Sequence, residues 1–274
     1  MTQPNPLQKF FRQPKVYLSL PSKGLYYETG ALQGDYNNVP IFAMSGMDEI
    51  IMKTPDALFT GEGTVKVIES CCPYIKNAKQ MPSIDLDAIL IAIRIATFGA
   101  KMNVSKTCNK CGTENEYEIE LNNFLDYFNS IKFTNTVPIF ENLIIKIRPL
   151  QYEEMSYFSI ENFKLQKTLS QVNDLKDEER QRQIDQIYAN LSELQLQLFL
   201  TVIENVQVDG QMVTEKSHIE EWLRNTDRES YKLIKEKLEQ NKEAWDMPPQ
   251  KVSCANCGTE NTVTVTMDQS SFFA

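Results

Sequence analysis

Four of the six cysteines stand in two copies of one short motif. Cys108 and Cys111 begin the segment CNKCGTEN, and Cys254 and Cys257 begin the segment CANCGTEN. A CxxC turn lets two thiolates converge on one ion, and the glycine after the second cysteine permits the tight backbone turn. Two such turns, here called knuckles, complete a tetrahedral site of four thiolates. The pattern therefore predicts one structural zinc ion per chain, bound by all four cysteines.

This site is expected to be closed, because the protein supplies all four ligands and leaves no coordination position for a water nucleophile. Two other uses of the cysteines remain open. A redox CxxC motif requires a thioredoxin-like setting with a following helix, which neither knuckle shows. Disulfides are expected in exported chains, and the N-terminus lacks the apolar core of a secretory signal, which predicts that the chain stays in the cytoplasm.

The residues after each knuckle have the same register. Tyr117, Ile119 and Leu121 lie six, eight and ten residues beyond Cys111, and three apolar residues hold the same offsets beyond Cys257, namely Val263, Val265 and Met267. Alternation of apolar and polar residues is typical of a strand with one buried face. Each knuckle is therefore predicted to lead into a strand.

The distance between the knuckles is unusual for such a site. Between Cys111 and Cys254 lie 142 residues, whereas a compact zinc ribbon separates its knuckles by roughly 15–20. We therefore interpret residues 112–253 as an insertion whose two ends are joined by the metal, which closes a long loop. The remaining cysteines, Cys71 and Cys72, are neighbours and point about 100° apart on a helix. They are interpreted as small buried thiols, with redox-sensitive thiols or auxiliary ligands as the alternative.

The elements that must position these residues include both strands and helices. Short alternating stretches near Val16 and near residues 39–44 predict strands, and an almost wholly apolar stretch over about 83–98 predicts a central helix that ends at Gly99. Asp209-Gly210 predicts a hairpin turn. The predicted fold class is α+β, with a flexible arm at 1–15, an N-terminal mixed α/β region at 16–107, a split zinc-ribbon and β region at 108–150 and 248–274 whose first part is extended, and a helical insertion at 151–247 that includes a hairpin near 206–213.

Composition argues against several classes of function. The net charge is −9 with a pI near 4.9, which disfavours a large phosphate-binding surface and hence a nucleic-acid partner. The longest apolar stretch, 88–96, is too short for a membrane span. The one histidine, His218, stands among glutamates, and no HExxH, GxSxG, GxGxxG or Walker motif occurs. We expect no enzymatic activity.

Several longer segments carry a resemblance to a known family. LSLPSKGLYY is followed by MDEIIMKTPDALFTGEGTVKVIESC, then by IDLDAILIAIRIATFG and a CxxCG knuckle. The C-terminal half adds a hairpin ending in Val-Thr, a helix with HIEEWL, a second knuckle, a short strand and a terminal SFF. In this order, the segments resemble the baseplate hub assembly proteins of T-even-type contractile-tailed phages, from about Val16 to Phe273.

The resemblance implies a non-enzymatic phage tail morphogenesis factor that acts in assembly of the central hub of the baseplate. Such a protein is either an assembly chaperone or a hub component, and its partners are other tail and hub proteins. It would act in the host cytoplasm during assembly, with the virion tail baseplate as a further location. The alternative function, from the knuckles alone, is a zinc-ribbon protein that binds nucleic acid or assists transcription.

Aromatic residues at three places are candidates for partner binding, since exposed apolar patches mark interaction sites. The alternative for each pair of aromatic residues is burial in the core, and for the pair at the C-terminus this alternative is favoured. The candidates are Phe10 and Phe11 in the arm, Tyr26 and Tyr27 after the turn, and Phe272 and Phe273 at the C-terminus.

Overall fold

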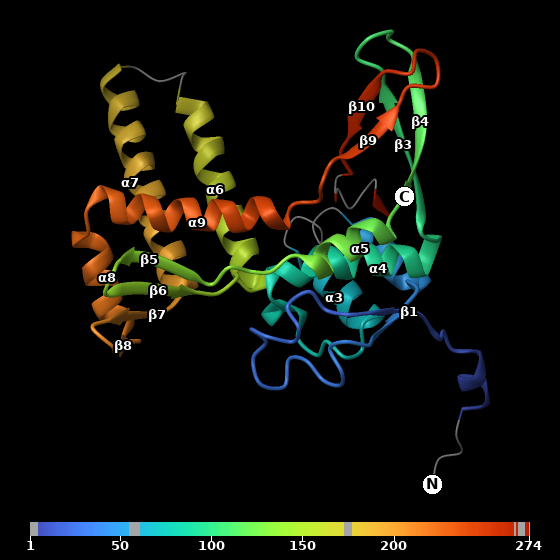
Figure 1. Cartoon of the computed structure of the whole chain (residues 1–274), viewed down its shortest axis with the longest axis horizontal. Helices are drawn as coiled ribbons and strands as arrows, with labels where there is room; N and C mark the ends of the chain where they lie inside the picture. The colour runs from blue at the N-terminus through green and yellow to red at the C-terminus, as the bar shows by residue number, and fades with distance from the viewer. Residues whose placement is uncertain (1–4, 55–60, 173–176, 266, 268–271, 274) are drawn as a thin grey trace. The chain divides into compact units, whose positions relative to one another are not determined.

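A computed structural model of the chain describes residues 5–54, 61–172, 177–265, 267 and 272–273 (Figure 1). Residues 1–4 of the predicted arm lie outside this part. The chain divides into two compact units: residues 1–132 together with 245–274 form the first, and residues 133–244 form the second. In the described part, no helix has both the length and the hydropathy needed to span a membrane.

The first unit is built around one buried helix. This helix, α4, covers Leu86–Phe98, and it packs against a two-stranded antiparallel sheet and against helices on either side of it in sequence. Its residues Ile89, Ile91 and Ile93 have no exposed surface, which confirms the predicted central helix. The other elements of this layer are β1 (Pro14–Leu18), β2 (Val39–Phe42), α1 (Gly46–Met52), α3 (Glu62–Cys71) and α5 (Asn122–Ser130), with short 3-10 helices η1 (Pro6–Phe10), η2 (Ala78–Gln80) and η3 (Ser83–Asp85).

A buried carboxylate joins the SKGLYY turn to the start of α4. Asp85 is fully buried and accepts hydrogen bonds from the Ser22 backbone N–H at 2.7 Å, the Ser22 hydroxyl at 2.6 Å and the Tyr27 hydroxyl at 2.9 Å. Burial raises the pKa of Asp85 to about 6, although these hydrogen bonds favour the ionised form. The contacts fix Tyr27 to the body of the first unit.

The N-terminal segment is attached to the first unit at Arg12. The Arg12 guanidinium donates to the Asp48 carboxylate at 3.1 Å, to the Ser70 carbonyl and hydroxyl at 2.7 and 2.6 Å, and to the Ala43 carbonyl at 2.6 Å. Charge-assisted bonds of this kind are among the stronger side-chain contacts. Within the predicted arm, the chain is thus held from Arg12 onward, whereas η1 before it buries no residue.

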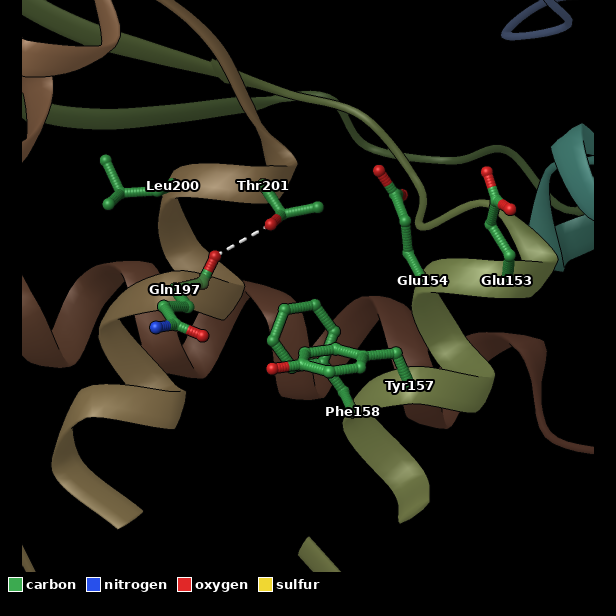
Figure 2. Close-up of a pocket in the computed structure, with 7 residues that line it drawn as sticks. All are labelled: Glu153, Glu154, Tyr157, Phe158, Gln197, Leu200 and Thr201. Carbon is green, nitrogen blue, oxygen red and sulfur yellow. Dashed lines mark hydrogen bonds between the residues drawn. The ribbon is translucent and has the colours of Figure 1, made fainter. Parts of the chain in front are cut away.

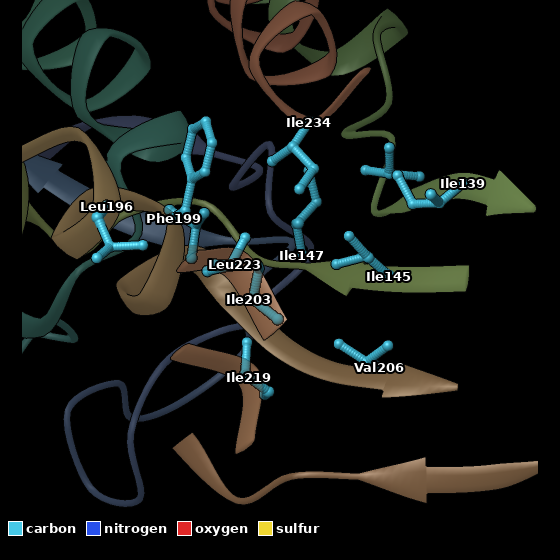
Figure 3. Packing of buried hydrophobic residues seen from close by; sticks show 12 residues of the cluster. Ile139, Ile145, Ile147, Leu196, Phe199, Ile203, Val206, Ile219, Leu223 and Ile234 are labelled. Carbon is cyan, nitrogen blue, oxygen red and sulfur yellow. The ribbon is translucent and has the colours of Figure 1, made fainter. Parts of the chain in front are cut away.

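In the part of the second unit that the structure describes, a four-stranded antiparallel sheet is combined with four helices. The strand order is β5 (Thr136–Phe140), β6 (Leu143–Ile147), β7 (Ile203–Val208) and β8 (Gln211–Val213). The helices are α6 (Tyr152–Gln171), α7 (Asp177–Val202), α8 (Lys216–Asn225) and α9 (Arg228–Trp245). Figure 3 shows the core of this unit, a buried cluster that includes Ile145 and Ile147 of β6, Phe199 of α7 and Ile234 of α9.

Most of the predicted elements of the second unit are present. A long helix covers the periodic apolar residues near 184–202, and β7 and β8 form the predicted hairpin. Its turn residues Asp209 and Gly210 both have positive φ, +49° and +80°, as a two-residue type I′ turn requires.

The predicted extended conformation of residues 108–150 is wrong over α5. Phe124 and Phe128 are four residues apart, which is one helical turn, and both are fully buried. Because both rings are buried on one side of this segment in the first unit, a helix is favoured here over an extended chain. Further along, β6 pairs with β7 across 60 residues of sequence, through contacts such as Ile145 with Val206, and β5 pairs with the other edge of β6. Strands β5 and β6 therefore lie in the second unit together with the helices.

Candidate metal centre

Each knuckle is the turn of a β-hairpin in the first unit. The first joins β3 (Lys101–Thr107) to β4 (Glu114–Glu120), and the second joins β9 (Gln250–Ser253) to β10 (Glu260–Val263). Figure 1 shows the two hairpins side by side, green and red, with both knuckles at the same end. Residues alternate between buried and exposed along β4 and β10, which confirms the common register predicted after the knuckles.

The backbone of the two knuckles is the same. The Cys108 N–H donates to the Thr113 carbonyl at 2.9 Å, and the Gly112 N–H donates to the Cys108 carbonyl at 3.0 Å; the second knuckle repeats both bonds at 2.9 Å. Gly112 and Gly258 have φ of +70° and +68°. Apart from the glycine and its chain neighbours, no atom of the described residues lies within 4 Å of a Cβ built on Gly112 or Gly258. The glycine is thus required by the left-handed backbone and not by a lack of space.

The four sulfur atoms lie close together. The Sγ atoms of Cys108 and Cys257 are 3.7 Å apart, as are those of Cys111 and Cys254, and all four lie within 4.8 Å of one another. A regular tetrahedron with zinc–sulfur bonds of about 2.3 Å has edges of about 3.8 Å. Disulfide sulfurs would be about 2 Å apart, and all four cysteines are free thiols. The donor set and its spacing fit one tetrahedral metal ion.

Hydrogen bonds in the knuckles favour thiolate at two of the positions. Hydrogen bonds from Thr113 lower the pKa of Cys111 to about 6, and the backbone N–H groups of Cys111 and Lys110 lower the pKa of Cys108. The hydrogen bond with Thr259 lowers the pKa of Cys257, but burial and the neighbouring sulfurs outweigh it, so that this pKa is raised. Metals bind cysteine as thiolate, so the hydrogen bonds of the first knuckle favour the form of Cys108 and Cys111 that can bind a metal.

Two buried asparagines cross from one knuckle to the other. Asn115 donates its amide to the Cys254 sulfur at 3.5 Å and accepts the Ala255 N–H at 3.0 Å. Asn261 makes the same two contacts with the first knuckle, to the Cys108 sulfur at 3.5 Å and from the Asn109 N–H at 3.2 Å. The two halves of the site therefore bind each other through protein contacts as well as through any ion.

These asparagines and the two threonines were not assigned a role from sequence. The signal was present, because the identity of the two copies extends through Thr and Asn to the end of CGTEN. The structure gives the reason. The Thr113 and Thr259 hydroxyls lie 3.4 and 3.3 Å from the sulfur of the second cysteine in their own knuckle, and each asparagine reaches the first cysteine of the other knuckle. Second-shell hydrogen bonds of this kind orient metal ligands.

The candidate partner-binding residues have three different environments. Phe10 and Phe11 are exposed, at 74 % and 56 % of their surface. Tyr26 and Tyr27 are half-buried, and Tyr27 is bound to Asp85. Phe272 and Phe273 are buried, and the Phe272 carbonyl accepts a hydrogen bond from Arg94 of α4 at 2.8 Å. Among the described residues the C-terminal pair thus packs in the core, which was the alternative favoured for it from the sequence.

Cys71 and Cys72 lie in the core of the first unit. Both are completely buried, which agrees with their interpretation as small buried thiols. Burial raises the pKa of Cys71 to about 12 and that of Cys72 well above its ordinary value. Both thiols are thus kept protonated. His218 is exposed at the start of α8.

The second unit contains an open groove between α6 and α7, of about 520 Å³. Figure 2 shows the rings of Tyr157 and Phe158 between the two helices, with Glu153 and Glu154 at the start of α6. Glu154 is bound by Arg148 through two bonds of 2.7 Å. The remaining lining residues, all on α7, are Gln197, Leu200 and Thr201.

Comparison with protein families gives one match. The family model of the T4 bacteriophage base plate protein matches residues 44–274, which is most of the chain. The chain belongs to this family. The resemblance to T-even-type phage baseplate proteins is thereby confirmed, although the SKGLYY turn precedes the matched segment. Membership implies other phage baseplate proteins as partners. Searches of characterised proteins and of solved structures gave no match.

Proposed function

We propose that this base plate protein is a non-enzymatic morphogenesis factor that acts in assembly of the central hub of the tail baseplate, either as an assembly chaperone or as a hub component. The observation that carries the proposal is the family match over residues 44–274, which includes both knuckles and the whole second unit. The segments around α4 and α8 resemble the hub assembly proteins of T-even-type phages, and this resemblance supports the more specific role in hub assembly. The protein would meet its partners in the host cytoplasm, before the tail is complete.

The second part of the proposal is that the four cysteines form a structural zinc ribbon. The sulfur spacing matches a tetrahedral zinc site, and the asparagines that bind two of the sulfurs form a second shell. Zinc would serve as an inert cross-link between residues 108–111 and 254–257. Structural zinc in small peptides contributes on the order of 10–16 kcal/mol at neutral pH, which is ample to hold two short hairpins together.

Deletion of the gene from the phage tests the assembly role. We expect particles that stop before the baseplate is complete, and restoration by the intact gene but not by one that carries Cys108→Ser. Asn109→Ala is the matched control, because this exposed side chain is neither a ligand nor a partner of a sulfur. Normal tails from the deletion would refute the proposal. Mass spectrometry of mature virions then separates the two roles, since a hub component stays in the particle and a chaperone does not.

A further inference from the structure

The four sulfur atoms of the candidate metal centre differ in their access to solvent. Cys111 is exposed and Cys257 is half-buried, whereas Cys108 and Cys254 are buried. The susceptibility of a protein thiol to oxidation follows its exposure as well as its charge, because the oxidant must reach the sulfur. An oxidant dissolved in water therefore meets Cys111 before the other three cysteines.

Each sulfur has a partner in the other knuckle at a short distance. The Sγ atoms of Cys111 and Cys254 are 3.7 Å apart, as are those of Cys108 and Cys257. A disulfide bond is about 2 Å long, so each pair needs to approach by less than about 2 Å to form one. Asn115, which follows the first knuckle, contacts the Cys254 sulfur at 3.5 Å and holds it against that knuckle. The sulfurs are thus placed to pair between the knuckles.

We propose that the four cysteines are also an oxidation site, at which the disulfides Cys111–Cys254 and Cys108–Cys257 replace the metal ion as the link between the two hairpins. The oxidant is a peroxide, which takes two electrons from a pair of thiolates. The inference rests on the four-cysteine site of the proposed function, but neither on the identity of the ion nor on the role in hub assembly.

The first disulfide forms in two steps. The Cys111 thiolate attacks one oxygen of hydrogen peroxide, the O–O bond breaks and hydroxide leaves, which gives a sulfenic acid on Cys111. The Cys254 thiolate then attacks the Cys111 sulfur, so that an S–S bond forms, the S–OH bond breaks and a second hydroxide leaves. Two thiolates are oxidised and one peroxide is reduced. Cys108 and Cys257 consume a second peroxide in the same way, and the ion, left without thiolate ligands, is released.

Disulfides between the knuckles preserve the link that the ion otherwise provides. They join residues that are 143 and 149 positions apart in the sequence, whereas a bond within a knuckle joins residues three positions apart. Only the long connections cross-link the two hairpins. A reducing cytoplasm favours the metal-bound thiolates, and an oxidising environment outside the cell favours the disulfides.

Disulfide mapping of the full native chain tests the pairing. The chain is purified under reducing conditions, freed of reductant, treated with hydrogen peroxide and alkylated. Trypsin separates the two cysteines of the first knuckle, since it cuts after Lys110. Both resulting peptides should be joined to the peptide that begins at Val252, and fragmentation should place Cys111 with Cys254. Bonds within either knuckle, or a bond between Cys108 and Cys254, would overturn the proposal.

Two further measurements use the same samples. A non-reducing denaturing gel should show faster migration of the oxidised chain, because a disulfide that closes a long loop keeps the denatured chain more compact. A reagent specific for sulfenic acid, added with the peroxide, should label Cys111 first. Cys71 and Cys72 are the internal control, since both are completely buried and should remain reduced. Unchanged migration, or first labelling at a buried cysteine, would overturn the proposal.

The fold of the oxidised chain is the final readout. Its circular dichroism should survive a chelator, whereas the reduced chain should lose the fold of the first unit under the same treatment. Loss of that fold by the oxidised chain would refute the disulfides as the link between the hairpins. The failure of the zinc proposal is distinguishable from this one, because a purified chain that contains no zinc can still be tested for the same disulfides.

Discussion

Asn115 and Asn261 hold equivalent positions on opposite sides of the four-cysteine site, and each binds the first cysteine of the other knuckle. The amide of Asn115 lies 3.5 Å from the Cys254 sulfur, and the amide of Asn261 lies 3.5 Å from the Cys108 sulfur. Each also accepts the N–H that follows that cysteine. The two hairpins are therefore related as two copies of one part, joined by reciprocal contacts.

We predict that Asn115→Ala or Asn261→Ala loosens the metal without removing it. The loss of a second-shell partner typically costs about 10–100-fold in metal affinity, since the sulfur loses a donor that orients it and supports its charge. Competition with a zinc chelator measures the effect. Asn109→Ala is the control, as its side chain is exposed and only its backbone N–H takes part in the site. Unchanged affinity in both asparagine variants would remove them from the site.

The sequence was sufficient to predict that these four cysteines come together, but not to predict the contacts across the candidate site. The CxxCG repeat fixes the local geometry of each knuckle, because turn and ligands lie within five residues. The cross-contacts of Asn115 depend on how two hairpins meet, since it binds a cysteine 139 residues further along the chain, and no local pattern encodes this. The same holds for Arg12 with Asp48 and for Asp85 with Tyr27. Helix α5 was missed for a related reason, since only the packing of Phe124 and Phe128 shows its helical face.

The glycines of the knuckles provide a second prediction. Gly112→Ala should lower the free energy of unfolding by about 1–2 kcal/mol, because an L-residue is strained at a left-handed φ, here +70°. Gly112→Asn should cost less, since asparagine tolerates this region. Chemical denaturation measures both. Gly46→Ala is the matched control: it also has open space around its Cβ but no positive φ, and it should be neutral or slightly stabilising. Equal effects at both glycines would contradict the backbone argument.

The buried carboxylate of Asp85 predicts a dependence of stability on pH. Its pKa is raised to about 6 in the folded chain, against about 4 when unfolded. The folded state therefore binds the proton more tightly, and the free energy of unfolding from this group should fall by up to about 3 kcal/mol as the pH rises from about 4 to about 6.

Denaturation of Asp85→Asn across this range tests the prediction, and the variant should show a smaller decrease than the native chain. Part of the decrease should remain, because burial and the nearby Asp246 raise the pKa of Asp87 to about 6 as well. Asp87→Asn should remove that second part. If the free energy of unfolding of Asp85→Asn depends on pH as steeply as that of the native chain, Asp85 is not the titrating group.

Arg12 is predicted to be the residue that attaches the N-terminal segment. Arg12→Ala should destabilise the first unit by about 2–3 kcal/mol, because the Asp48 carboxylate and the Ser70 carbonyl each lose a charge-assisted donor. Limited proteolysis should then cut further into β1. Lys9→Ala is the control, since Lys9 precedes the anchor and its ammonium lies over the ring of the neighbouring Phe10. Stability unchanged by Arg12→Ala would show that β1 pairing alone holds the segment.

The central claim is that one metal ion, held by four cysteines, joins the two hairpins of the first unit. The most direct measurement is the mass of the purified chain under non-denaturing conditions, before and after chelation, with circular dichroism on the same samples. We predict one zinc ion per chain, lost together with the fold of the first unit on chelation and in Cys108→Ser or Cys257→Ser, but retained in Cys71→Ala. A chain that is fully folded and free of metal with all four thiols reduced would contradict the account.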